Sequence, residues 1–180
     1  SMLGDGHLQK ILPDSPRSRF TEGHSEKQEG WVEWKTKELK PLSRPSGKVY
    51  LTARKKSSNG KIINDPTRKY IQCQLRTSLH PIFTQLESLW YTRNKDGTYK
   101  YKKTGRRIKC LPINLSLTPL IIAIWFMDDG HNSQSSKGIN IATMDCTPED
   151  TFNLRDKLHQ FGFKCEAKRY KEKQYYLCLL

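Results

Sequence analysis

The chain has 180 residues, enough for one domain or for two small halves that share a core, and carries 32 Lys+Arg against 18 Asp+Glu, a formal charge of +14. This excess favours a polyanionic partner, of which nucleic acid is the commonest, while a merely basic soluble protein is the alternative. The five cysteines are scattered without a C-x-x-C pair. They fit neither a disulfide framework nor a zinc site, and indicate a reducing compartment. No signal peptide or membrane span is visible.

The first elements are predicted to be two short strands and a helix. Residues 7–12 and 17–22 form the strands, and the segment between them contains two prolines, an aspartate and a serine, which favour a turn. The helix is predicted to begin at Ser25, where Ser25 and Gln28 match a capping box, and to run to about Leu39.

Two further strands are predicted over residues 49–55 and 69–77. The second has the clearest alternation in the chain, with apolar Ile71, Cys73 and Leu75 on one face and Gln72, Gln74 and Arg76 on the other. Gln and Arg are the side chains that recognise adenine and guanine in a major groove. The polar positions are therefore candidates for DNA recognition, although an ordinary solvent face is the alternative.

An amphipathic helix over residues 80–91 precedes a very basic stretch, residues 93–109. In this stretch Tyr99 and Tyr101 alternate with lysines, and Asp-Gly and Thr-Gly pairs predict turns. A hairpin that follows phosphates would use such a mixture of basic and aromatic side chains. A solvated ribbon would have the same composition.

The stretch from Leu117 to Gly130 predicts a short core helix. Thr118 can cap it with Pro119 at its first position, and Gly130 can end it in the left-handed conformation. Residues 120–127 are all apolar, so the helix is expected to be buried on every side, and it is too short to cross a bilayer.

The end of this helix suggests a metal site. Asp128 and Asp129 lie where unpaired carbonyls and the negative end of the helix dipole gather, so a bound cation would remove an electrostatic conflict. Adjacent helical residues point about 100° apart, so one of the two is expected to be the main ligand. An exposed acidic turn is the alternative.

The remaining chain predicts a strand over 137–144, a helix over 147–161 and a strand pair over 163–170 and 174–180. The order of elements suggests a twofold α+β arrangement. Leu3-Gly4-Asp5-Gly6 also aligns with Met127-Asp128-Asp129-Gly130, which suggests an internal repeat in which Asp5 and Asp129 are equivalent.

The segment IAIWFMDDG, residues 122–130, resembles the LAGLIDADG motif, and its context LPINLSLTPLIIAIWFMDDG looks like that of single-chain homing endonucleases from organellar introns. The resemblance covers nearly the whole chain. It implies an α+β LAGLIDADG fold of two pseudo-twofold α-β-β-α-β-β-α halves with saddle-shaped sheets. We expect residues 1–110, with the basic linker, and 111–180 to be the halves, both truncated at the outer ends.

The resemblance implies a catalytic group of Asp5, Asp129 and Lys109, the last from the K-x-x-P match at residues 109–112. Asp5, Asp129, Gly4 and Asp128 would bind Mg²⁺, for which Mn²⁺ could substitute. Phosphodiester hydrolysis needs such ions to activate water and to neutralise developing charge. The candidate DNA-binding residues are Arg17, Arg19, Arg54, Gln72, Gln74, Arg76, Lys102, Lys103, Lys137 and Lys168.

The expected function is sequence-specific cleavage of double-stranded DNA by a monomer with internal symmetry, in a mitochondrion or chloroplast and without a membrane partner. The alternative is an RNA-binding intron maturase on the same scaffold, since RNA recognition favours exposed aromatic side chains such as Tyr99 and Tyr101. A third possibility, an HNH-type nuclease, rests on Gly130-His131-Asn132, but no second His or Asn follows at a ligand-like spacing.

Overall fold

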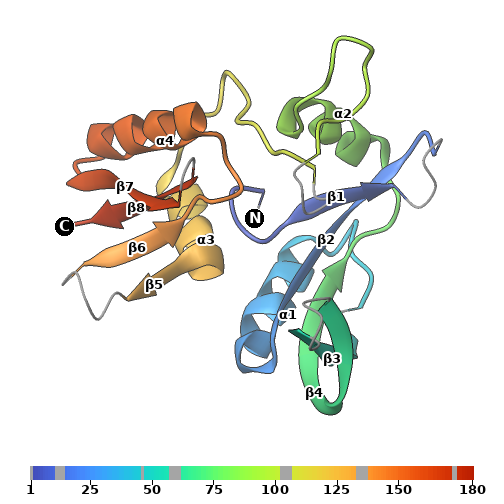
Figure 1. Ribbon diagram of the computed structural model, residues 1–180. Coiled ribbons are helices and arrows are strands. Elements are labelled where there is room, and N and C mark those ends of the chain that lie inside the picture. The colour runs from blue at the N-terminus through green and yellow to red at the C-terminus, as the bar shows by residue number, and fades with distance from the viewer. Residues whose placement is uncertain are drawn as a thin grey trace. The chain divides into compact units, whose positions relative to one another are not determined.

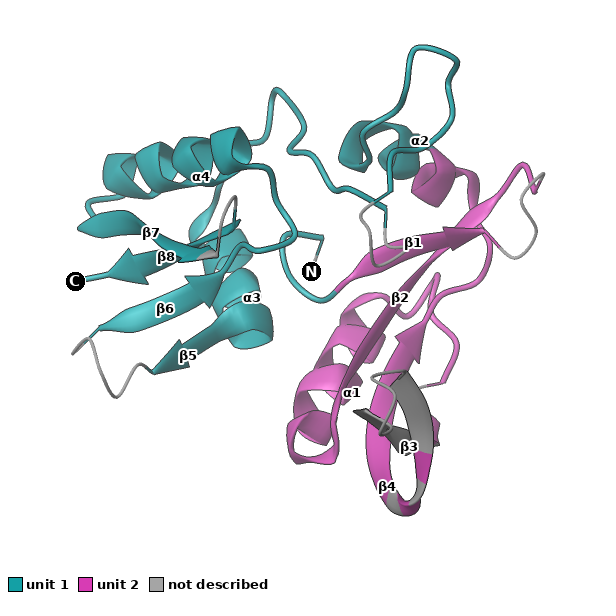
Figure 2. Ribbon diagram, viewed as in Figure 1, with its two compact units in different colours: residues 1–5, 85–180 teal, residues 6–84 magenta. Residues whose placement is uncertain are grey.

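A computed structural model describes residues 2–10, 15–45, 47–56, 62–101, 107–132, 138–171 and 174–180 (Figure 1). It divides into two compact units (Figure 2): unit 1 is Ser1–Asp5 with Gln85–Leu180, and unit 2 is Gly6–Thr84. The halves predicted from the sequence, residues 1–110 and 111–180, are defined by the repeat and not by contacts, and they stay a prediction.

Unit 2 is built on a four-stranded antiparallel sheet in the order β1-β2-β4-β3. Its elements are β1 (His7–Lys10), β2 (Ser18–Ser25), a 3-10 turn (Glu26–Gln28), α1 (Glu29–Glu38), β3 (Gly47–Lys56), β4 (Ile62–Arg76) and the first part of α2 (Pro81–Trp90). Helix α1 packs against β4 and β2. The buried apolar side chains of this unit include Leu8, Phe20, Val32, Cys73, Leu75 and Phe83.

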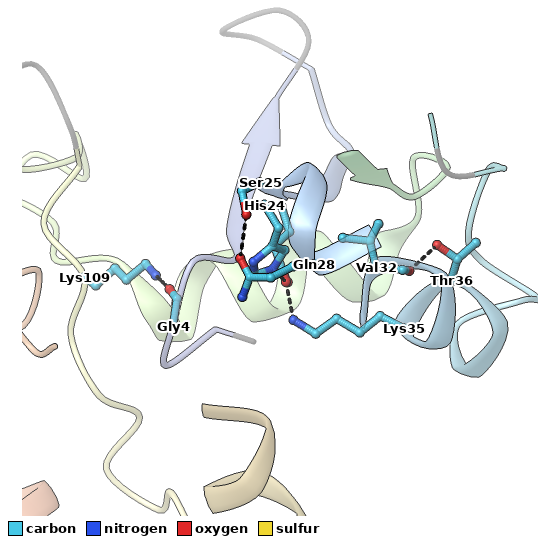
Figure 3. Close-up of polar contacts among 9 residues, drawn as sticks. Gly4, His24, Ser25, Gln28, Val32, Lys35, Thr36 and Lys109 are labelled. Carbon is cyan, nitrogen blue, oxygen red and sulfur yellow. Dashed lines mark hydrogen bonds and ion pairs between the residues drawn. The ribbon is translucent and has the colours of Figure 1, made fainter. Parts of the chain in front are cut away.

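A buried ionic group lies in the same unit. Glu22, on β2, accepts hydrogen bonds from Lys35 of α1 and from His24, and all three side chains are almost fully buried. Figure 3 shows Lys35 on α1, next to Thr36, whose hydroxyl donates to the Val32 carbonyl one turn earlier at 2.8 Å. The two partners lower the pKa of Glu22 to about 2 although burial alone would raise it. The carboxylate is therefore ionised within the core.

Unit 1 contains a second antiparallel sheet in the order β5-β6-β8-β7. Its helices and strands are the rest of α2, α3 (Pro119–Asp129), β5 (Gly130–Asn132), β6 (Ile139–Ala142), α4 (Pro148–Gln160), β7 (Cys165–Lys171) and β8 (Gln174–Leu179). Helix α3 contacts β5 and β6, while α4 packs on β7 and β8 (Figure 1). The most deeply buried side chains are Trp125, Ile141, Leu154, Leu158 and Leu177.

The two sheets have the same strand order. In each, a helix lies in the chain between the second and third strands: α1 between β2 and β3, and α4 between β6 and β7. The described chain is thus an α+β protein with two four-stranded antiparallel sheets and four α-helices, which confirms the predicted α+β class with two antiparallel sheets. The helix predicted over 147–161 is α4, capped by the Thr147 hydroxyl, which accepts from the Asp150 N–H at 3.1 Å.

Three predicted strand and cap details were wrong. Strand β4 begins at Ile62 instead of residue 69, because its early part pairs only with β3, so Pro66 interrupts no ladder with β2. Strand β5 was missed because its three residues follow α3 directly. The Ser25 hydroxyl approaches the Gln28 side chain at 3.5 Å and caps no backbone N–H, since a 3-10 turn precedes α1.

The prediction that the helix over 117–130 is buried on every side was also wrong. Ile122 and Trp125 are buried, but Leu120 is 60% exposed and Met127 is 47% exposed. Within unit 1, residues 2–5 form a turn in place of a helix, so no second helix from this segment packs along α3. The cap was predicted correctly, since the Thr118 hydroxyl accepts from the Ile121 N–H at 3.2 Å.

Candidate metal and phosphodiester site

Helix α3 brings Asp128 and Asp129 to its C-terminal end and passes directly into β5. Gly130 has an extended conformation, with φ −78° and ψ 143°, so the predicted left-handed ending is wrong. Glycine is needed for another reason: a Cβ at this position would lie 2.1 Å from the Phe126 ring. Because the chain passes closely over Phe126 at Gly130, Asp128 and Asp129 are held at the end of α3, directly before β5.

The turn at residues 2–5 packs against the same helix end. Gly4 is buried, and a Cβ there would lie 2.5 Å from the Asp128 Cβ and 3.0 Å from one Asp128 carboxylate oxygen. Only glycine permits this approach. The turn also carries Asp5, whose charge acts on Asp129, so the two aspartates that the repeat aligned belong to one cluster within unit 1.

Lys109 lies in this cluster. Its ammonium group donates to the Gly4 carbonyl at 2.6 Å (Figure 3). It also donates to the Met2 carbonyl at 3.1 Å. Burial lowers the pKa of Lys109, against the opposite influence of the acidic groups around it, Cys146, Asp145, Asp129 and Asp5. Lys109 is thus held beside the carboxylates by the backbone of the N-terminal turn.

The cluster contains more negative charge than Lys109 balances. Burial, and then the charge of Asp5, raise the pKa of Asp129 to about 7, although Lys109 acts to lower it; Asp128 and Asp145 raise it further. Carboxylates that are both buried and crowded favour a proton or a metal cation. Their oxygens and the backbone carbonyl of Gly4 are the hard ligands that Mg²⁺ prefers.

Sequence reasoning missed two members of this cluster. Asp145 is exposed, and Cys146 follows it just before the cap of α4. Burial raises the pKa of the Cys146 thiol to about 12, so it stays protonated and is no nucleophile. In the sequence, Asp145 is an acidic residue that follows a short strand and precedes a helix. Acidic residues near helix starts are common, so this position did not indicate a site.

The linker that carries Lys109 is held by stacked aromatic and arginine side chains. The Arg107 guanidinium lies 4.1 Å from the centre of the Tyr91 ring and 4.9 Å from that of Tyr99, and it forms an ion pair with buried Glu87. The Arg93 guanidinium also stacks on Tyr99, 4.3 Å from the centre of its ring. Residue 91 pairs with Lys109 through an isolated β-bridge, so the stack sets the place of the lysine.

These contacts change the interpretation of the two linker tyrosines. Tyr99 is engaged by both arginines and meets the Tyr91 ring edge-on at 6.1 Å. It is therefore not a free platform for a base. Tyr101 is 59% exposed and keeps that possibility.

The predicted alternation in β4 is confirmed. Cys73 and Leu75 are buried, whereas Gln72, Gln74 and Arg76 lie on the opposite face. The Gln74 amide donates to the Gln72 carbonyl oxygen at 2.9 Å. Gln72 lies over Gly23 of β2, where a Cβ would come within 2.5 Å of its amide nitrogen. That these side chains face DNA stays a prediction.

The other basic candidates are spread over both units. Arg17 is exposed just before β2, and Arg19 is partly exposed on that strand. Lys168, on β7, lies 3.7 Å from Glu166, which neutralises part of its charge. Arg54 belongs to β3, but its side chain lies outside the described residues, as do Lys102, Lys103 and Lys137. No described helix is long and apolar enough to span a membrane.

Several known proteins are similar to this chain in sequence. The chain is 29% identical over 143 residues to Protein RecA of Mycolicibacterium fallax, covering 79% of the chain and 27% of that protein. It is 28% identical over 170 residues to Protein RecA of Mycolicibacterium flavescens, covering 88% of the chain and 33% of that protein. It is also 29% identical over 161 residues to the cytochrome b mRNA maturase bI2 of Saccharomyces cerevisiae, covering 88% and 34%.

The chain spans about a third or less of the length of these relatives. The model of the LAGLIDADG DNA endonuclease family matches residues 1–180, and the α+β fold with its repeated sheet agrees with that match. The chain therefore belongs to the LAGLIDADG DNA endonuclease family.

Proposed function

We propose that the chain is a sequence-specific endonuclease that hydrolyses phosphodiester bonds of double-stranded DNA with a divalent cation, Mg²⁺, for which Mn²⁺ can substitute. The observation that supports this most is the cluster of Asp5, Asp129 and Lys109 within unit 1. A family member that no longer cleaves has no need to keep a partly buried carboxylate, Asp129, between the charge of exposed Asp5 and the ammonium of Lys109.

The donor set fits a hard divalent cation. Asp5 and Asp129 would supply carboxylate oxygens, with Asp128 beside them, and burial followed by the charge of Asp5 raises the pKa of Asp129, which a bound cation would counteract. A bound cation would lower the pKa of a water molecule and neutralise charge that develops on the phosphate. Asp5 and Asp129 would hold that position, with Gly4 keeping the turn close enough to the helix for both to reach it.

Lys109 would act on the phosphate. An ammonium group has three N–H donors, and the backbone carbonyls of Met2 and Gly4 accept two of them. The third N–H is then available for a phosphate oxygen or for the attacking water. Because the donors are fixed before substrate arrives, their effect is greatest where negative charge develops in the transition state.

Binding of the duplex would use the polar face of the unit 2 sheet together with the net charge of +14. Gln72 and Gln74, joined by their own hydrogen bond, present a fixed pair of amides to base edges. The monomeric state and the mitochondrial or chloroplast location belong to this proposal, and the location rests on the resemblance alone.

An RNA maturase is the second candidate, favoured by the 29% identity to the cytochrome b mRNA maturase over 88% of the chain. On this alternative the aspartates serve folding, and Tyr101 offers an exposed ring for an unstacked base. The charged surface would bind intron RNA in place of DNA.

One cleavage assay separates the two. The protein is incubated with a library of randomised duplexes in Mg²⁺, in Mn²⁺ and in EDTA, and cut molecules are selected and sequenced. We expect cutting at one sequence, dependent on the metal, lost in Asp129→Asn and retained in Asp156→Asn, which removes an exposed carboxylate of α4. Tight duplex binding without any cutting in either metal would overturn the proposal, and intron splicing by Asp129→Asn would favour the maturase.

A further inference from the structure

Three arginines of unit 2 converge on one pocket. The pocket has a volume of about 230 Å³ and is lined by Arg19, Arg44, Pro45, Gly47, Val49, Gln74 and Arg76. It contains no acidic side chain, and no ion pair is found for its arginines among the described residues. Water occupies about 30 Å³ per molecule in the liquid, so the pocket has room for a small anion with a few waters.

The backbone explains why these residues meet. Arg19 lies on β2 and Arg76 at the end of β4, both on the polar face of the sheet. The chain after α1 runs alongside the end of β4: Ser43 bridges to Thr77, and the Arg44 N–H donates to the Arg76 carbonyl at 2.9 Å. Arg44 is thereby brought to the corner where β3 begins.

Arg19 is oriented by a neighbour, and the three arginines repel one another. Gln9, opposite Arg19 on β1, accepts from the Arg19 Nε at 3.2 Å and from its Nη2 at 2.9 Å, which fixes the plane of the guanidinium. Burial, followed by the charges of Arg76 and Arg44, lowers the pKa of Arg19. Three like charges held together without an acid favour an anion of high charge density.

We propose that this pocket binds a phosphate group between Arg19, Arg44 and Arg76, and that its usual source is a backbone phosphate of the bound nucleic acid. The assignment of the phosphate to nucleic acid rests on the proposed function, whereas the binding of a phosphate group by the pocket does not. Guanidinium groups form paired hydrogen bonds with phosphate oxygens, and several of them can surround one phosphate. Arg76 then positions the duplex and does not recognise guanine, in contrast to the role that the alternation suggested.

The first arm of the test measures duplex affinity against salt for the unaltered chain, for Arg44→Gln and for Lys37→Gln. Lys37 is an exposed residue of α1 outside the pocket, so its variant removes the same charge. Each phosphate contact contributes about 0.9 to the slope of log affinity against log salt. We expect Arg44→Gln to reduce the slope by about 0.9 on every duplex sequence, and Lys37→Gln to change it far less.

The second arm uses inorganic phosphate. Millimolar phosphate should raise the melting temperature of the unaltered chain above that in chloride of equal ionic strength, and Arg44→Gln should lose this rise. A phosphate effect without a change in salt slope would assign the pocket to free phosphate, and would support the same chemistry even if the chain binds no duplex. Circular dichroism of Arg44→Gln confirms its fold.

Two results would overturn the inference. One is a correctly folded Arg44→Gln variant with an unchanged salt slope and an unchanged response to phosphate. The other is an Arg76→Gln variant that loses affinity for one base pair at one position while binding other duplexes normally, because that pattern belongs to base recognition.

Discussion

Replacing Asp129 by asparagine tests whether the carboxylates at the end of α3 repel one another without metal. Burial and Asp5 raise the pKa of Asp129 to about 7, from an ordinary value of 3.8. The folded state then holds a proton that the unfolded state releases, so this group makes the protein less stable as pH rises from about 4 to about 7, with no further loss above. A tenfold change in proton affinity is worth 1.36 kcal/mol, so the full loss at pH 8 is about 4 kcal/mol.

Asparagine carries no charge at any pH, so Asp129→Asn should recover most of this free energy of unfolding at pH 8 and almost none at pH 4. Urea denaturation in EDTA at both pH values measures it, with Asp156→Asn as the control for loss of an exposed carboxylate. Added Mg²⁺ should stabilise the unaltered chain and not the variant. Equal stability of variant and unaltered chain at pH 8 would refute the reasoning, because the acidic cluster would then cost the fold nothing.

Three other changes probe the same structure. Lys109→Met should slow single-turnover cleavage far more than it weakens binding, because we propose that the ammonium acts mainly on the transition state; a parallel fall in duplex affinity would make it an ordinary phosphate contact. Gly4→Ala should destabilise the fold by about 1–3 kcal/mol and reduce cleavage, since its Cβ would lie 2.5 Å from Asp128, whereas Gly30→Ala, with no neighbour within 4 Å, should be neutral or slightly stabilising in thermal unfolding. Glu22→Gln should cost about 3 kcal/mol in denaturant unfolding at pH 7, and the difference from the unaltered chain should vanish as pH falls from about 4.5 to 2, since the partners lower the pKa of Glu22 to about 2; a cost that persists at pH 2 would point to packing.

Local signals in the sequence predicted much of this molecule. The Thr118 cap, the alternation of β4 and the helix over 147–161 depend on neighbours in the chain, and the structure has all three. The equivalence of the two aspartates, inferred from a four-residue repeat, stays a prediction, although the charge of Asp5 does act on Asp129.

Other features depend on contacts between segments distant in sequence, which no local pattern encodes. Glu22, His24 and Lys35 would each be expected at the surface, and their mutual pairing lowers the cost of burying them. Arg44 follows a helix without any periodic pattern and becomes notable only where the end of β4 meets it. Gly130 looked like a helix ending, but the Phe126 ring explains it.

If the chain recognises duplex DNA as proposed, the glycine beneath Gln72 affects how its DNA sequence preference can be changed. A methyl group at Gly23 would displace the flexible end of Gln72, and through the hydrogen bond between the glutamines it would also move Gln74. Altered preference could thus arise from a residue that touches no base. Libraries that vary Gln72 and Gln74 but hold position 23 constant would sample only the side chains that fit over a glycine, so the three positions should be randomised together and their couplings measured by double-mutant cycles.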